Sequence, residues 1–141
     1  MTQQEFIAAF TKPPEDWDHE LIFCQARERL RRLKDEQQFH ILFPIAVKAQ
    51  DLRFPVCDSA ILLRELSPDC PVSCEEAVRA MLPSWDISIE EVPFYLAARF
   101  GTDRVRRAVR AIESGTLSDV QKRMLDTVLY WLGKYDEAYG T

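Results

Sequence analysis

Glycine is scarce in this chain, with 4 in 141 residues. This scarcity argues against a turn-rich β fold and favours helices joined by short connections. No apolar run approaches the roughly 18 residues of a membrane-spanning helix. The first residues, Met-Thr-Gln-Gln-Glu, lack the basic and apolar segments of a secretory signal. We therefore expect a cytoplasmic protein that has no membrane partner.

The chain also lacks the short motifs of common enzyme active sites. It has no Gly-rich phosphate loop, no Gly-x-Ser-x-Gly and no His-Glu-x-x-His. Its four cysteines are too few and too unevenly spaced for a disulfide framework, and they are expected to be reduced. We predict that the protein is not an enzyme and binds no cofactor.

A zinc site is the one metal centre that the sequence allows. Cys70 and Cys74 have Cys-x3-Cys spacing in a proline-rich loop, and Cys57 with His40 could complete four ligands. Only one close pair exists, however, and Cys57 and His40 fall in apolar helical segments. The pattern favours small buried cysteines over a metal site.

Thiol catalysis would need a base beside Cys24 or Cys57. His19 and His40 are the only histidines in the chain. His19 lies among acidic residues, which predicts a solvated first helical turn. His40 is flanked by Phe39 and an isoleucine, which predicts a partly buried, hydrogen-bonded side chain. Neither position favours a catalytic thiol.

The helical pattern is clearest between Trp85 and Ile112. Val105, Ala108, Val109 and Ile112 recur at i, i+3, i+4 and i+7, one face of a helix. This stretch predicts two helices joined by a tight turn, an αα-hairpin around which the rest packs.

The ends of these two helices are predicted from capping residues. Ser88 and Glu91 form a capping box, but Pro93 then either distorts the first turn or starts the regular helix; we favour the second. Gly101 fits a left-handed residue after the first helix, and Thr102 then caps the second.

The remaining segments also predict helices. Phe39–Gln50 is the most apolar; we expect a buried helix with Pro44 in its first turns, with two short strands, 40–43 and 45–48, as the alternative. Ser118 with Gln121 should open the last long helix, which should use Val120, Met124, Val128 and Trp131 as its face and break at Gly133, with one more turn over 135–141. The other expected helices are 2–10, capped by Thr2 and ended by Lys12-Pro13-Pro14; 16 or 18 to about 35, capped by Asp16 or Asp18; 55–66; 73–83, capped by Ser73; and 102–115.

These segments predict a single all-α domain over residues 1–141. It should contain about seven helices in antiparallel pairs, as an α-α superhelix or an irregular bundle.

Asp51–Leu66 resembles the inter-helix turn and second helix of a HEAT-type repeat. An Asp begins the turn, and Val56 and Ala60 follow at helical spacing, although Cys57 stands where the pattern has an Arg. Leu132–Ala138 is similar to the turn of a tetratricopeptide repeat. Both resemblances imply helix pairs that bind another protein on a concave face.

Charged and aromatic residues supply the candidate binding surfaces. Arginine stripes could bind nucleic acid, or they could be solvated helix faces with partners such as Glu28 to Arg32; the net charge of −5 favours the second. The first-turn glutamates could cap helices or form an acidic patch, as in bacterial immunity proteins of similar size and charge that block a toxin. The residues predicted to bind a partner are Arg104, Arg106, Arg107, Arg110, Trp85, Glu90 and Glu91. The arginine stripes also include Arg27, Arg29, Arg31 and Arg32, and the acidic patch would also include Glu75, Glu76 and Asp86. Aromatic anchors, if exposed, are Phe94, Tyr95, Tyr130 and Trp131.

The sequence thus predicts non-enzymatic binding of another protein, whose identity it does not specify. An immunity protein and a nucleic-acid-associated module remain the alternatives.

Overall fold

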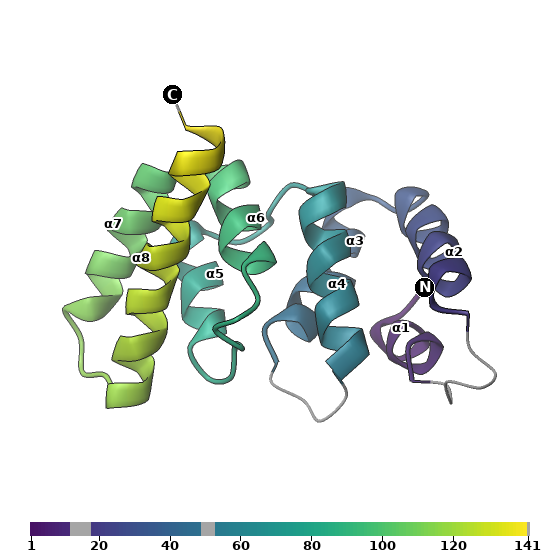
Figure 1. Ribbon diagram of the computed structural model, residues 1–141, viewed down its shortest axis with the longest axis horizontal. Helices are drawn as coiled ribbons and strands as arrows, with labels where there is room; N and C mark the ends of the chain where they lie inside the picture. The colour runs from purple at the N-terminus through teal and green to yellow at the C-terminus, as the bar shows by residue number, and fades with distance from the viewer. Residues whose placement is uncertain (12–17, 49–52, 141) are drawn as a thin grey trace.

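The computed structural model describes residues 1–11, 18–48 and 53–140, and these ranges contain eight helices and no strand (Figure 1). The all-α prediction is confirmed for the described residues, with eight helices rather than about seven. The helices are α1 (Gln3–Ala9), α2 (His19–Arg31), α3 (Asp35–Ala46), α4 (Arg53–Leu66), α5 (Cys74–Met81), α6 (Glu91–Phe100), α7 (Thr102–Glu113) and α8 (Asp119–Tyr139).

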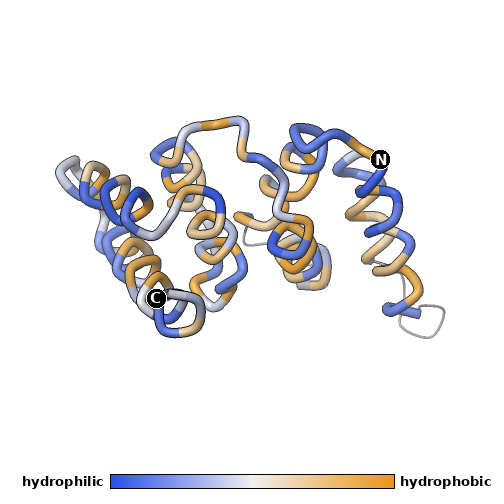
Figure 2. Tube along the Cα trace, turned by 90° about the horizontal axis from the view of Figure 1, so that it is seen from above, coloured by the Kyte–Doolittle hydropathy of each residue, from blue (hydrophilic) through white to orange (hydrophobic). Residues whose placement is uncertain are grey.

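The order of the helices along the chain follows the long axis of the molecule (Figure 1). α1 and α2 lie at one end, α3 and α4 in the middle, and α7 and α8 at the other end. Helices α5 and α6 pack between the middle pair and the last pair, with α6 in contact with α4, α7 and α8. The apolar faces turn inward (Figure 2) and form one buried cluster with side chains from every helix.

Four predicted N-caps are confirmed, each with a side-chain oxygen accepting a backbone N–H at 3.1 Å. The full reciprocal box forms at the start of α8, where Ser118 N–H also donates to Gln121 Oε1. At the start of α1 the carboxylate of Glu5 pairs instead with Arg29 on α2. The four capping residues are Thr2, Asp18, Ser73 and Ser118. The predicted stop at Lys12-Pro13-Pro14 and the alternative cap Asp16 lie outside the described residues.

Helix α2 ends at Arg31, four residues before the predicted end at Asp35. The buried Gln38 of α3 explains the early end, because its Nε2 donates to the carbonyls of Leu30 and Leu33 at 2.9 and 3.2 Å. Carbonyls at a helix end need such partners. A side chain from the next helix therefore terminates α2.

Helix α3 is a single helix, so the alternative of two strands is wrong. It runs from Asp35 to Ala46, so it begins before the predicted Phe39 and ends before the predicted Gln50, with Val47 as its C-cap. Pro44 sits near its C-terminus rather than in its first turns. A proline there leaves the carbonyl four residues earlier without its usual donor. Gln3 Nε2 of α1 supplies that donor to His40 O at 2.6 Å, which fastens α1 to α3.

The start of α6 differs from the predicted capping box. The helix begins at Glu91 without a side-chain cap, and Ser88 donates both its N–H and its hydroxyl to Asp86 Oδ1. Pro93 is the third helical residue, where an N–H has no intrahelical acceptor anyway. The proline therefore distorts nothing, and the regular helix starts two residues before it.

Gly101 ends α6 and directly precedes α7. Its φ of +85° is positive as predicted, but its ψ of 147° is extended, so it is not the left-handed residue that we expected. Thr102 is the first residue of α7 and not its cap. A glycine is needed here because a single residue turns the chain between the two helices, with a positive φ that other residues rarely adopt.

Helix α8 corrects three predictions. It runs through Gly133 to Tyr139 without a break, so neither the separate last turn nor the tetratricopeptide-like turn at 132–138 exists. Its buried face is Leu125, Val128 and Leu132, whereas Val120 is 61% exposed. Packing on α6 and α7 outweighs the cost of one helical glycine, about 1 kcal/mol.

In the described ranges, no helix combines the length and the apolar character that crossing a bilayer requires.

Candidate protein-binding surface

The second half of α8 carries four aromatic side chains, and three of them contact Phe94 of α6. Phe94 lies edge-on to these three, with ring centroids 5.5 to 6.4 Å apart. Tyr135 and Tyr139 are 4.8 Å apart, and Tyr130 and Trp131 are 5.0 Å apart. We call this group the aromatic surface: Phe94, Tyr130, Trp131, Tyr135 and Tyr139.

The aromatic surface is open to solvent at two of its tyrosines. Tyr130 is 55% exposed and Tyr139 is 60% exposed, while the other three rings are half-buried and hold the group against the core. Trp131 is fixed further by its indole N–H, which donates to Ile87 O at 2.8 Å. The exposed Ile87 extends the apolar area.

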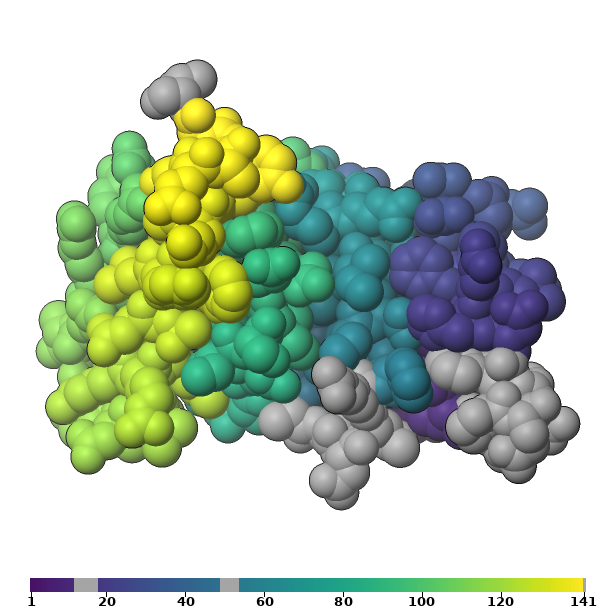
Figure 3. All heavy atoms as spheres, viewed as in Figure 1, coloured from purple at the N-terminus to yellow at the C-terminus, as the bar shows by residue number. Residues whose placement is uncertain are grey.

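Two cationic side chains lie beside the rings of the aromatic surface. The guanidinium of Arg64 on α4 lies 5.8 and 5.6 Å from the ring centroids of Tyr135 and Tyr139. Lys134 lies 5.7 Å from the ring of Tyr130. Helices α8, α6 and α4 lie side by side on the face seen in Figure 3, in yellow, green and teal. Tyrosine, tryptophan and arginine are the residues most enriched at the energetic centres of protein interfaces.

Two predicted aromatic anchors are buried instead. Trp85 is 1% exposed, and its indole N–H donates to Ile89 O at 3.2 Å. Tyr95 is fully buried and donates its hydroxyl to Pro68 O. The prediction that Trp85 binds a partner is therefore wrong, because aromatic spacing alone does not say which ring faces the core.

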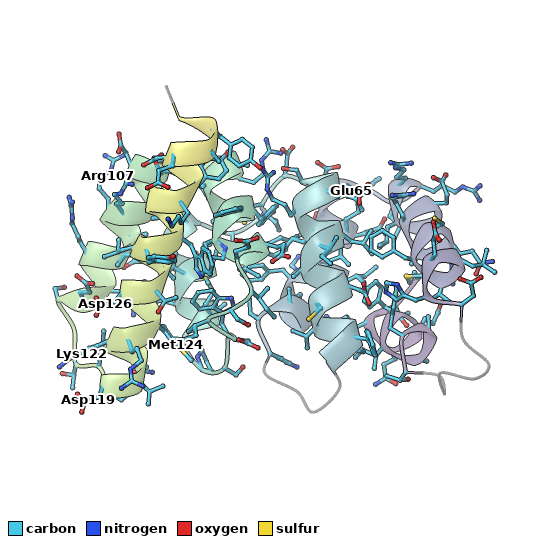
Figure 4. The ribbon with its side chains drawn as sticks, viewed as in Figure 1. Glu65, Arg107, Asp119, Lys122, Met124 and Asp126 are labelled. Atoms are coloured by element: carbon cyan, nitrogen blue, oxygen red, sulfur yellow. The ribbon has the colours of Figure 1, made fainter. Side chains whose placement is uncertain are left out.

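The four arginines predicted on α7 divide into two kinds. Arg106 is half-buried and pairs with Asp136 of α8, and its hydrogen bond lowers the pKa of that carboxyl. Arg104, Arg107 and Arg110 are exposed, and within the described part of the chain none has a carboxylate at ion-pair distance. Figure 4 shows Arg107 on α7, at the end of the molecule opposite α1 and α2.

The arginines of α2 are mostly engaged. Arg27 pairs with Glu65 of α4 at 3.0 Å, and Arg29 pairs with Glu5 of α1. Glu28 pairs with Arg31, three residues on, rather than with the predicted Arg32. Helix α2 therefore presents less free positive charge than its sequence suggested.

Two of the predicted acidic residues make local contacts with residues two to four positions away. Glu75 pairs with Arg79 within α5, and Asp86 accepts both bonds from Ser88. Glu90 and Glu91 are half-buried at the start of α6, and burial raises the pKa of Glu91, with the charge of Glu90 acting in the same direction. An acidic patch built on these two glutamates would be partly covered by the fold.

His19 and Asp58 form a contact that the sequence did not indicate. His19 Nε2 lies 2.9 and 3.0 Å from the two carboxylate oxygens of Asp58, which is only 3% exposed. The imidazole ring also lies about 6 Å from the rings of Phe10, Phe23 and Phe54. The predicted solvated first turn is confirmed, because His19 is the first residue of α2 and its side chain is 45% exposed. Its contact with Asp58 of α4, 39 positions away, was not predicted.

All four cysteines are free thiols in the structure. No three His, Cys, Asp or Glu side chains gather there as a metal site would need. Burial raises the pKa of Cys70, and it raises that of Cys74 to about 11, so both thiols stay protonated at neutral pH. Cys57 lines an open hollow of about 410 Å³ beside His19 and Asp58.

No protein-family model, curated protein or solved structure matches this chain. The HEAT-type resemblance stays a prediction: Asp51 and Leu52 lie outside the described residues, and the rest of that stretch forms α4, with Val56 and Ala60 buried.

Proposed function

We propose that this chain is a non-enzymatic module that binds another protein through the aromatic surface. The observation that carries the proposal is the pair of exposed tyrosines, Tyr130 and Tyr139, set in a group of half-buried rings. A tyrosine offers an apolar ring and a polar hydroxyl at a low entropic cost of ordering, because only two side-chain torsions must be fixed.

The extent of the aromatic surface supports a protein as its ligand. Tyr130 and Tyr139 are nine residues apart on α8, about 13 Å along its axis and about two and a half turns, so they flank the group of rings on opposite sides of the helix. Arg64 and Ile87 widen the surface beyond α8. A central group of aromatic and arginine side chains surrounded by polar residues is the usual composition of a protein interface.

We also infer that the helices pair antiparallel in a HEAT-like array, in a cytoplasmic protein. Contacts between α3 and α4, α6 and α7, and α7 and α8 support the pairing of consecutive helices. Residual dipolar couplings, which report helix directions, test this arrangement.

Substitution of the two exposed tyrosines tests the proposed function. In the double variant Tyr130→Ser and Tyr139→Ser, a partner captured from native lysate by the wild-type chain and then purified should bind at least tenfold more weakly, a loss of about 1.4 kcal/mol. Isothermal titration calorimetry measures the change. Because both side chains are exposed, the free energy of unfolding should change by less than about 0.5 kcal/mol for each.

A matched control comes from exposed apolar residues elsewhere. Leu21 and Val120 are 53% and 61% exposed, so Leu21→Ser with Val120→Ser removes similar apolar area away from the aromatic surface. This control should bind the partner as the wild type does. Equal binding by both double variants would exclude the aromatic surface as the interface.

A further inference from the structure

Helix α7 has an outward face that the aromatic surface does not include. Its inward face is fully committed to the core through Val105, Val109 and Ile112. On the outward side, Arg104, Arg107 and Arg110 stand three residues apart. They therefore form one row about 9 Å long on the helix surface.

The fourth arginine of α7, Arg106, differs from the three in this row because it packs against α8. Arg106 points toward α8 and is neutralised by Asp136 and Asp103. The other three lack a carboxylate at ion-pair distance in the part of the chain that the structure describes, and Arg104 only stacks on the ring of Phe100 at 5.2 Å. Their positive charge is available to a ligand.

Arg107 lies between two surface hollows. One, of about 390 Å³, is lined by Arg107 with Asp103, Arg106 and Arg110. The other, of about 410 Å³, lies between α7 and the start of α5, and Arg104 and Arg107 line it together with Ser73. Side chains that approach the arginine row thus have space on either side of Arg107.

Acidic residues limit how far the positive row extends. Glu113 occupies the next position in the same three-residue spacing, and Asp103 and Glu75 line the two hollows. A nucleic acid presents a phosphate about every 1.7 Å of duplex axis. Such a polyanion would meet these carboxylates and the net charge of −5. A short segment with a few spaced carboxylates would meet only the arginines.

We propose that the outward face of α7 binds an acidic, Asp- and Glu-bearing segment of a protein, through Arg104, Arg107 and Arg110. This contact is separate from the aromatic surface. Guanidinium groups bind carboxylates with paired, charge-assisted hydrogen bonds. The complementarity of charge gives the face specificity for acidic segments and a binding rate that falls with salt.

The test uses a synthetic probe: a fluorescein-labelled helical peptide with glutamates at every third or fourth position, and a matched peptide with glutamine at those positions. Fluorescence anisotropy at low salt should show the wild-type chain binding the glutamate peptide at least tenfold more tightly than the glutamine peptide. The triple variant Arg104→Gln, Arg107→Gln and Arg110→Gln should lose at least tenfold in affinity. Arg107→Glu alone should lose at least threefold, which covers the case of a poorly folded triple variant.

The control triple variant changes the net charge equally on α2: Arg29→Gln, Arg31→Gln and Arg32→Gln. It should stay within threefold of the wild type, since these residues are on another helix. The double variant of Tyr130 and Tyr139 should also bind the glutamate peptide with wild-type affinity. The tyrosine variant therefore tests the aromatic surface and the arginine variants test the outward face of α7, so either proposal can fail without the other. Three results would overturn the proposal. They are an equal loss of peptide affinity in the two arginine triple variants, equal affinity of the wild type for the glutamate and glutamine peptides, and tighter binding to a DNA duplex that depends equally on the arginines of α7.

Discussion

The contact between His19 and Asp58 is the most unusual feature at the scale of single residues. Asp58 is a buried carboxyl whose oxygens both lie within hydrogen-bond distance of one imidazole nitrogen. Burial raises the pKa of Asp58 above its usual value, and the hydrogen bond and charge of His19 only partly oppose this. The charged form of Asp58 is therefore unfavourable in the folded protein.

This shift predicts a pH-dependent effect of Asp58→Asn. A carboxyl with a raised pKa binds its proton more readily in the folded state than in the unfolded state, so its contribution to stability falls as pH rises from the usual value of 3.8 through the raised one. The neutral asparagine does not bury a charge at any pH. We expect the free energy of unfolding of the variant, relative to wild type, to be greater at pH 7 than at pH 4.

Urea unfolding at a series of pH values measures this difference. Making the same comparison in a His19→Gln background removes the titration of the imidazole while keeping a donor opposite residue 58. If the free energy of unfolding of Asp58→Asn relative to wild type stays constant from pH 4 to pH 7, or grows as pH falls, the pKa of Asp58 is not raised by folding.

At the scale of the elements, two glycines on neighbouring helices have opposite roles. Gly101 lies at the junction of α6 and α7 with a positive φ, whereas Gly133 lies inside α8. A Cβ added at either position would meet no heavy atom within 4 Å. The effect of substitution should therefore come from the backbone conformation rather than from steric contact.

The substitutions Gly133→Ala and Gly101→Ala should change stability in opposite directions. Alanine at 133 lowers the entropy of the unfolded chain and suits a helix, so the free energy of unfolding should rise by about 0.5–1 kcal/mol. Alanine at 101 must adopt a strained φ, which should cost about 1–3 kcal/mol. Thermal unfolding of the two variants against wild type measures both. A loss of stability in Gly133→Ala would show that α8 is not continuous through this residue.

At the scale of the whole molecule, the N-terminal helices join the rest through few elements. The main contacts of α1 are with α3, and those of α2 are with α4. Beyond these apolar contacts, α2 is held by His19 with Asp58 and by Arg27 with Glu65. We expect α2 to open locally at a lower free energy than α7 and α8, which pack on each other and on α6.

Removing the imidazole should weaken this end of the molecule selectively. In His19→Ala, the buried Asp58 loses its bond, so the free energy of opening of α2 should fall by about 1–3 kcal/mol. Native-state hydrogen exchange should show faster exchange in α2 and unchanged exchange in α7 and α8. Arg31→Ala, which removes only an ion pair within α2, should leave the rates nearly as they are. Equal acceleration across all helices would contradict this division.

The helical class and the starts of four helices could be predicted from the order of residues along the chain. N-caps such as Asp18 and Ser118 bond to amides three residues away, and the apolar spacing of α7 repeats within one helix. These interactions are local, so the order of residues along the chain is sufficient to predict them.

The ends of helices, the exposure of aromatic rings and the ion pairing of arginines depend on the tertiary structure. Gln38 of α3 terminates α2, packing carries α8 through Gly133, and Trp85 is buried while Tyr130 is not. Arg106 differs from Arg107 because it meets Asp136, 30 residues away. Each outcome depends on contacts between distant segments, and these exist only once the helices have packed.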